Sequence, residues 1–179
     1  AWRYDRAGRL LAIPDQRSFP GIECAKRGLM PLPLVERAGL LWVLPDAQGR
    51  LDAALLDAHL CGVDEDLISL RLAGYYHYES RMLERSANWK MPIDTFLEPY
   101  HFTALHRDTV APIFFPNLCL FDAFGLHHRE AVLRRSIEQL RRLPDTEWDF
   151  VHHSAISYQL FPNSVFVLQA DHVETWRMF

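Results

Sequence analysis

The sequence contains no uninterrupted apolar segment near the ~20 residues that a membrane-spanning helix requires, and no block rich in lysine and arginine. The formal net charge is −4, and this charge together with the absence of a basic block argues against nucleic acid as a partner. The first ten residues, AWRYDRAGRL, lack the organisation of a secretory signal peptide. They also lack an initiator methionine, so we expect the chain to begin inside a longer protein. With 49% hydrophobic and 23% charged residues, the composition is that of a globular protein without a membrane partner.

Cysteine is scarce, and this scarcity excludes a disulfide framework. The three cysteines are widely separated and odd in number, at Cys24, Cys61 and Cys119. This usage predicts a reducing, cytoplasmic compartment. None of the three lies in a C-x-H or C-x-x-H pair, and neither an internal repeat nor a low-complexity segment is present. The 179 residues suffice for one sizeable core or two small ones.

One central stretch, Asn88–His106, combines an acid and two histidines in the pattern E-x-x-H-x-x-x-x-H, formed by Glu98, His101 and His106. Two imidazoles with a carboxylate are a donor set typical of non-haem Fe(II) that keeps positions open for O2. Glu98 and His101 are three residues apart and share a helix face. The two histidines are five apart, about 140° around an ideal helix, so one regular helix would not direct both at one ion. Pro99 is expected to break the helix between them.

The hydrophobic pattern predicts an α+β chain in three parts. Residues 1–50 read as a small antiparallel β unit with hairpins near Gly8 and within 35–44. Residues 51–73 form a connector with a short helix at 51–60, followed by a turn at Asp64–Asp66. Residues 74–179 begin with a strand at 75–85 and become helical from Asn88. An antiparallel sheet follows, with two strands around Gly125, a short helix or charged linker at 134–142, and long strands at 151–161 and 165–178.

The central stretch resembles the catalytic domain of Rieske non-haem iron oxygenases, the α subunits of ring-hydroxylating oxygenases. The resemblance is carried by Asn88-Trp89-Lys90 and by Tyr100 beside the acid and the two histidines. It implies that His101 and His106 bind a mononuclear Fe(II). It also implies that Glu98 is a bridging carboxylate, bonded to His101 and placed for electron entry. Aspartate is commoner at that position, and glutamate resembles the variant of the branch that acts on quaternary amines.

The N-terminus resembles the same family independently. Residues Ala1-Trp2-Arg3-Tyr4-Asp5 with Gly8 are similar to the segment that follows the last histidine of a Rieske motif. The resemblance implies that residues 1–50 are the back part of a Rieske β domain. It implies that residues 74–179 start a helix-grip (START/Bet v 1-like) catalytic domain. The four ligands of a [2Fe–2S] cluster are absent from this chain, so the cluster is expected in the intact protein and this piece alone is expected to be inactive.

The third iron ligand of the family is an acid far downstream, and we expect it beyond Phe179. Five carboxylates follow His106 on the predicted linker or sheet and are disfavoured: Asp145, Glu147, Asp149, Asp171 and Glu174. The resemblance further implies O2, a small organic substrate that is hydroxylated or demethylated, and a ferredoxin or flavin reductase as electron donor. It also implies a homotrimer or an α3β3 assembly.

Other interpretations remain open from the residues alone. His101 and His106 could be ordinary polar residues, and Glu98 a surface acid. The chain could be a metal-free helix-grip module that binds a small ligand. A zinc hydrolase is disfavoured because H-E-x-x-H is absent. The adjacent pairs His127-His128 and His152-His153 are predicted on strands, where neighbouring side chains face opposite ways and cannot chelate together.

Overall fold

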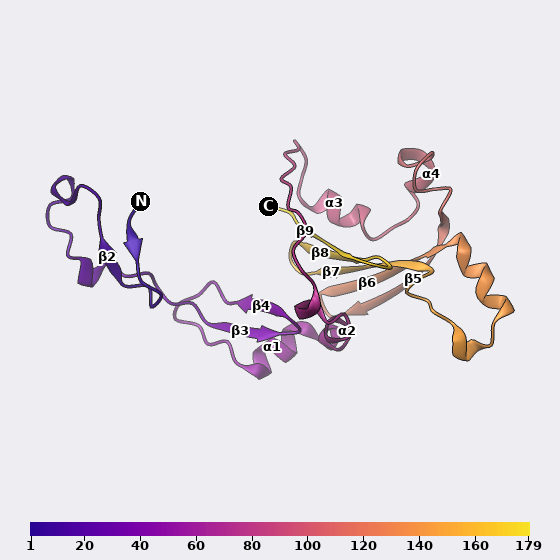
Figure 1. The fold of residues 1–179 in the computed structure, drawn as a ribbon, viewed down its shortest axis with the longest axis horizontal. Coiled ribbons are helices and arrows are strands. Elements are labelled where there is room, and N and C mark those ends of the chain that lie inside the picture. The colour runs from indigo at the N-terminus through magenta and orange to yellow at the C-terminus, as the bar shows by residue number, and fades with distance from the viewer. The chain divides into compact units, whose positions relative to one another are not determined.

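The computed structural model describes residues 1–179 and divides into two compact units (Figure 1). The first unit comprises Ala1–Asp57 and Leu67–Tyr75, and the second comprises Ala58–Asp66 and Tyr76–Phe179. No helix in either unit combines the length and the apolar character needed to cross a bilayer. Each unit is described by itself below.

The first unit is built on two hairpins. Strand β1 (Arg3–Tyr4) pairs with β2 (Leu10–Ala12), and β3 (Leu34–Arg37) pairs with β4 (Leu40–Val43), both antiparallel. In the second hairpin, Ala38 and Gly39 have φ of 58° and 74°, the left-handed conformation that matches the twist of a two-residue turn. The predicted β character of this region is therefore confirmed. Short 3-10 turns complete the unit at η1 (Gln16–Ser18), η2 (Cys24–Lys26) and η3 (Leu72–Gly74).

Two short helices, α1 (Ala53–Leu60) and α2 (Val63–Ser69), follow the hairpins. The predicted helix at 51–60 is confirmed, and the Asp52 carboxylate accepts the Leu55 N–H at 3.0 Å at its start. The predicted turn at Asp64–Asp66 is wrong, because these acids occupy the first turn of α2. Negative side chains are favourable there, since the unpaired N–H groups of a helix N-terminus carry partial positive charge.

The strand predicted at 75–85 is also wrong. This segment forms no helix or strand. Its large side chains project into solvent, with Tyr76, Tyr78 and Met82 exposed by 84%, 87% and 76%. Alternating residues form a strand only when a neighbouring strand takes up the backbone hydrogen bonds, and this segment pairs with none.

The second unit is organised around one five-stranded antiparallel sheet with the order β5-β6-β7-β8-β9. The strands are β5 (Phe114–Phe124), β6 (His127–Arg134), β7 (Ser154–Leu160), β8 (Ser164–Leu168) and β9 (Val173–Arg177). The predicted strand pair around Gly125 is confirmed, and Gly125 has the positive φ of 62° that the turn requires. The expected long strand at 165–178 is instead two strands. They separate where the Gln169 N–H donates to the His172 carbonyl at 2.9 Å and closes a turn.

The segment between β6 and β7 contains no α-helix. Residues Arg135–Arg142 form a 3-10 helix, η4, and Asp145–Glu147 form a further short turn, η5. Of the two alternatives expected at 134–142, a short helix or a charged linker, the structure has the helix, which is of the 3-10 type.

One face of the sheet, termed the site face, carries a row of directly opposed residues, Phe121, Glu130, Ser157 and Val167, on β5 to β8. Opposed residues of antiparallel strands point to the same side. Helix α3 (Lys90–Thr95) packs on this face through Ile93, which forms a buried cluster with Val165 and Val167. Figure 1 shows α3 and α4 on the same side of the sheet.

The opposite face of the sheet is held by a charged network and by a buried histidine. The Arg129 guanidinium pairs with Asp66 and, at 2.8 Å, with Asp122. Its hydrogen bond to Asp122 raises the pKa of Arg129. Burial beside this network raises the pKa of Tyr158 to about 12. The network is partly exposed, so we expect it to contribute about 1 kcal/mol or less.

His127 is fully buried on this face and uses both ring nitrogens. Its Nε2–H donates to the His59 carbonyl at 2.9 Å, and its Nδ1 accepts the Phe161 N–H at 3.0 Å. Protonation would place a second N–H against that of Phe161. Burial also disfavours the charged imidazolium, so the pKa of His127 lies below its ordinary 6.5.

This arrangement predicts acid sensitivity. The unfolded chain takes up the His127 proton as the pH falls through 6.5, whereas the folded protein resists it until a lower pH. The stability is therefore complete above pH 6.5 and declines below it. We expect the melting temperature of wild type to fall further than that of His127→Gln between about pH 7.5 and about pH 5.5. Parallel declines in the two proteins would rule out His127 as the source.

Candidate metal centre

The acid and histidines predicted as the site lie in a broken helical segment. Asn88 Oδ1 accepts the Lys90 N–H at 3.0 Å where α3 begins. Helix α3 ends at Thr95, with the Leu97 N–H bonded to the Asp94 carbonyl in a tighter turn. Pro99 has no N–H to continue the ladder, and α4 (Phe102–Leu105) starts only afterwards. The predicted break in the helix at Pro99 is confirmed.

This break allows two histidines five residues apart to face each other, which one regular helix would not. His101 is the N-cap and His106 the C-cap of α4, so neither lies inside a regular helix. Their ring centroids are 5.3 Å apart, with the ring planes inclined at 72°. Two imidazoles bound to one ion through bonds of about 2.1 Å have centroids roughly 4.5–5.5 Å apart. The ring separation therefore fits a shared metal ion.

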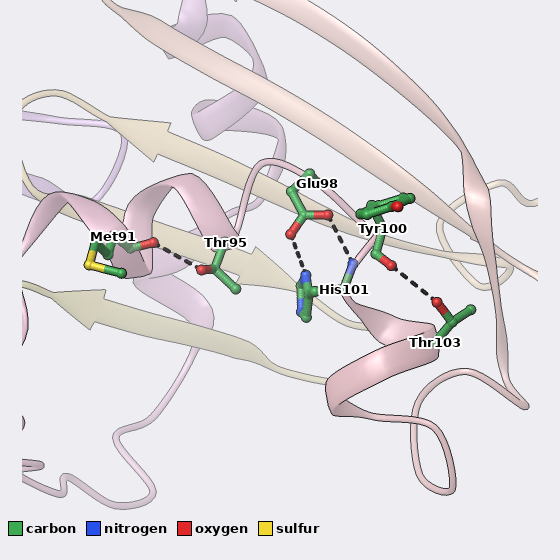
Figure 2. Close-up of polar contacts among 6 residues, drawn as sticks. All are labelled: Met91, Thr95, Glu98, Tyr100, His101 and Thr103. Carbon is green, nitrogen blue, oxygen red and sulfur yellow. Dashed lines mark hydrogen bonds and ion pairs between the residues drawn. The ribbon is translucent and has the colours of Figure 1, made fainter.

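Glu98 binds the first histidine twice (Figure 2). Its Oε2 accepts the His101 backbone N–H at 3.0 Å, and its Oε1 lies 2.6 Å from His101 Nδ1. A carboxylate acceptor at Nδ1 assigns the proton to that nitrogen and leaves Nε2 with its lone pair. This is the arrangement in which proteins present a histidine to a metal, with the carboxylate fixing the tautomer and raising the basicity of the ring.

The segment between the histidines also anchors them to the sheet. The Phe102 ring lies 4.8 Å from that of His101, 6.4 Å from that of His106 and 5.9 Å from that of Phe114 on β5. Phe102 was not among the residues predicted for the site, although its position directly between two candidate ligands is a signal that the sequence offers. Tyr100 is 81% exposed, and its contact with Thr103 involves only its backbone carbonyl (Figure 2).

The structure brings no third metal donor to this pair. Among residues 1–179, no group of three or more histidine, cysteine, aspartate or glutamate side chains has a geometry able to hold a metal ion. Of the five disfavoured carboxylates, Asp171 pairs with His172 at 2.7 Å, which lowers the pKa of Asp171, and Glu174 accepts from Trp176. Neither side chain completes a centre at His101.

The two adjacent histidine pairs do not gather donors either. His127 and His128 face opposite sides of β6 as predicted, and His128 Nδ1 lies 2.9 Å from Gln159 Oε1. The second pair was predicted on a strand and is instead in the turn before β7. There, the Nδ1 of His153 lies 2.9 Å from Ser136 Oγ.

The comparison with protein families defines the class of this chain. Residues 72–179 match the model of the ring hydroxylating alpha subunit, catalytic domain. The chain therefore belongs to the ring-hydroxylating α subunits, and its resemblance to Rieske oxygenase α subunits is confirmed.

Individual relatives agree with this class. Over 108 residues the chain is 29% identical to a Comamonas testosteroni protein, named as the iron-sulfur subunit TsaM2 of a toluene-4-sulfonate monooxygenase system. That match covers 60% of this chain and 27% of the relative. Solved structures of the quaternary ammonium Rieske monooxygenase CntA share the fold. The inhibitor complex has a TM-score of 0.70 at 17% identity, and the L-carnitine complex has 0.68 at 15%. Each covers 99% of this chain and 45% of CntA.

The chain thus spans about a quarter of the length of the curated relative and less than half of CntA. The fold it shares with these structures is a mixture of helices and antiparallel sheet, as predicted.

Proposed function

We propose that this chain belongs to an oxygenase that activates O2 at a mononuclear non-haem iron bound by His101 and His106. The observation that carries the proposal is the Glu98–His101 contact beside the ring of His106. It leaves the Nε2 lone pair of His101 for a metal and places a carboxylate directly behind the ligand. The membership of this chain in the ring-hydroxylating α subunits also supports an oxygenase function.

Bound ferrous iron supplies the redox chemistry of O2 activation, which no amino-acid side chain provides. The residues of this chain hold and tune the site. His101 and His106 are its two imidazole donors, fixed at the ends of α4. Glu98 orients His101 by holding its Nδ1 proton and, in our proposal, is the bridge through which an electron reaches the site. Phe102 packs edge-on against the ring of His101 and lies beside that of His106, which helps to fix the positions of both imidazoles.

The finer organisation that we propose follows the order of the family. Residues 1–50 are the back part of a Rieske-type β domain, 51–73 a connector, and 74–179 the start of a helix-grip catalytic domain. The five-stranded sheet with α3 packed on one face supports the last assignment. In the intact protein we propose a [2Fe–2S] cluster, a ferredoxin or flavin reductase as electron donor, and a trimeric assembly.

The reaction that we propose is hydroxylation or oxidative demethylation of a small organic substrate. The names of the relatives indicate toluene-4-sulfonate for one and quaternary ammonium compounds for the other. Both names describe monooxygenases, which supports monooxygenation of a substrate for this chain as well.

The proposal is tested with the protein expressed from its complete gene, titrated with Fe(II) without oxygen after any native iron is removed. We expect about one mononuclear iron per chain, with positions open to nitric oxide, a stable probe of ferrous sites. The readout is the electron paramagnetic resonance signal of the nitrosyl complex. A protein that takes up no mononuclear iron but binds an apolar ligand would instead support the metal-free module.

A further inference from the structure

An arginine at the end of β6 is held in a fixed orientation on the site face of the sheet. Arg134 lies four residues from Glu130, an even step along the strand, so its side chain points to the same side. Its Nε–H donates to the Ser154 carbonyl at 3.3 Å, and its Nη2–H donates to Gln169 Oε1 at 2.7 Å. These bonds tie the guanidinium to β7 and to the turn after β8.

The guanidinium covers the ring of Phe114. Phe114 is directly opposite Arg134 on β5, and the guanidinium carbon lies 4.7 Å from the ring centroid. A cation over an aromatic face is attracted by the ring quadrupole, and the attraction is stronger away from water. Phe114 is only 7% exposed, so its ring is largely out of solvent. Arg134 therefore restricts where the Phe114 ring can lie.

Two routes connect Phe114 to the candidate metal centre. The first runs through side chains, since its ring lies 5.9 Å from that of Phe102, which lies 4.8 Å from that of His101. The second runs through the backbone. The Phe114 N–H donates to the Val110 carbonyl at 3.1 Å, and the Val110 N–H donates to the His106 carbonyl at 3.0 Å. Each route ends at one of the two histidines.

The histidines depend on such contacts because the helix between them is short. Helix α4 has four residues, too few to be stable without tertiary packing. His101 and His106 occupy its two ends, which are the positions of a helix that fray. A binding site must hold its side chains within about 0.5 Å of the productive geometry. The packing against the sheet must therefore supply a precision that α4 alone does not.

We propose that Arg134 is a positioning residue for the candidate metal centre and acts through Phe114. By fixing the Phe114 ring, it fixes Phe102 and the turn before β5, and with them the separation of the two imidazoles. The guanidinium stays protonated and cannot itself bind iron. This inference rests on the proposed function, since it assigns a supporting residue to that site.

The test uses protein from the complete gene and compares two neighbouring arginines. Arg134→Gln removes the guanidinium over Phe114. Arg135→Gln is the matched control, because the Arg135 guanidinium lies 5.0 Å from a different ring, that of Phe115. Both variants lose one positive charge, and the two charges are on adjacent residues. By electrostatics alone, each loss would favour the binding of Fe(II), so weaker binding indicates lost positioning.

Anaerobic titration gives the dissociation constant of Fe(II) for each protein. We expect Arg134→Gln to weaken binding about tenfold, the lower end of the loss found when support for a metal ligand is removed. Arg135→Gln should change it by less than about twofold. Arg134→Lys keeps a cation but not the planar group, so its affinity should lie between those of wild type and Arg134→Gln. The nitrosyl signal of Arg134→Gln should also broaden, because the imidazoles take up a range of orientations.

A double-mutant cycle tests the route through the rings. In a Phe102→Leu background, Arg134→Gln should cause less than about a threefold further loss of Fe(II) affinity, because the side-chain route is already broken. An undiminished loss in that background would show that Arg134 acts independently of Phe102.

The proposal is contradicted by equal Fe(II) affinity in Arg134→Gln and Arg135→Gln, by tighter binding in Arg134→Gln, or by an undiminished loss in the Phe102→Leu background. If Arg134→Gln does not fold, Arg134→Lys decides, and wild-type affinity in that variant overturns the proposal. Wild type that binds no mononuclear iron refutes the proposed function as well. Iron binding that no Arg134 variant weakens refutes this inference alone.

Discussion

Replacing Glu98 with glutamine is expected to leave iron bound and to reduce turnover about 10- to 100-fold. The side chains are nearly identical in size, and the amide oxygen can still accept the His101 Nδ1–H. The variant loses the negative charge that now lies 2.6 Å from that nitrogen. Without it, His101 becomes a less basic ligand, and the proposed path for the electron loses its carboxylate. Product formed per iron per minute is the quantity to compare.

Two further variants separate the role of this charge from simple disruption. Glu138→Gln removes an exposed acid from η4 and should leave turnover unchanged. Glu98→Asp keeps the charge and should recover part of the activity lost in the glutamine variant. Near-normal product formation by Glu98→Gln would contradict the bridging role of Glu98.

The second large effect concerns the two histidines. His101→Ala and His106→Ala should each reduce bound iron from about one per chain to less than roughly a tenth, because each removes one of the protein donors on which metal affinity depends. His128→Ala is the control, since His128 is on the same face of the sheet but is bonded to Gln159. Metal analysis after anaerobic loading and desalting gives the iron content.

Iron retention by either alanine variant would exclude that histidine as a ligand. Circular dichroism of the same samples shows whether the fold persists. Because His106 is an exposed cap residue of a short helix, its replacement should cost little stability. Loss of iron by His106→Ala with an unchanged melting curve is therefore the clearest form of the expected result.

Much of the site could be predicted from sequence because its determinants are local. The donor types, the three-residue step from Glu98 to His101 and the helix break at Pro99 all lie within nine residues of one another along the chain. The structure confirms the Glu98–His101 contact and adds that the two histidines occupy the N-cap and C-cap positions of α4. The role of His101 and His106 as iron ligands remains a proposal.

Features that depend on partners distant in the chain could not be predicted in this way. Residues 75–85 alternate as a strand does, but alternation does not supply a neighbouring strand. The sequence of residues 165–178 predicts one continuous strand, whereas in the structure a turn closed by Gln169 and His172 divides it into two. The burial of Glu130 on β6 could not be predicted, because cross-strand register sets its surroundings and the sequence alone does not reveal that register.

In the proposed site, Glu98 supports an iron ligand without itself binding iron. A crystal structure of the protein from the complete gene, loaded with Fe(II) in the absence of oxygen, tests it directly. We expect iron about 2.1 Å from Nε2 of both His101 and His106, with the Glu98 carboxylate still hydrogen-bonded to His101 Nδ1. Iron bound by the Glu98 carboxylate, or iron that either imidazole does not reach, would contradict it.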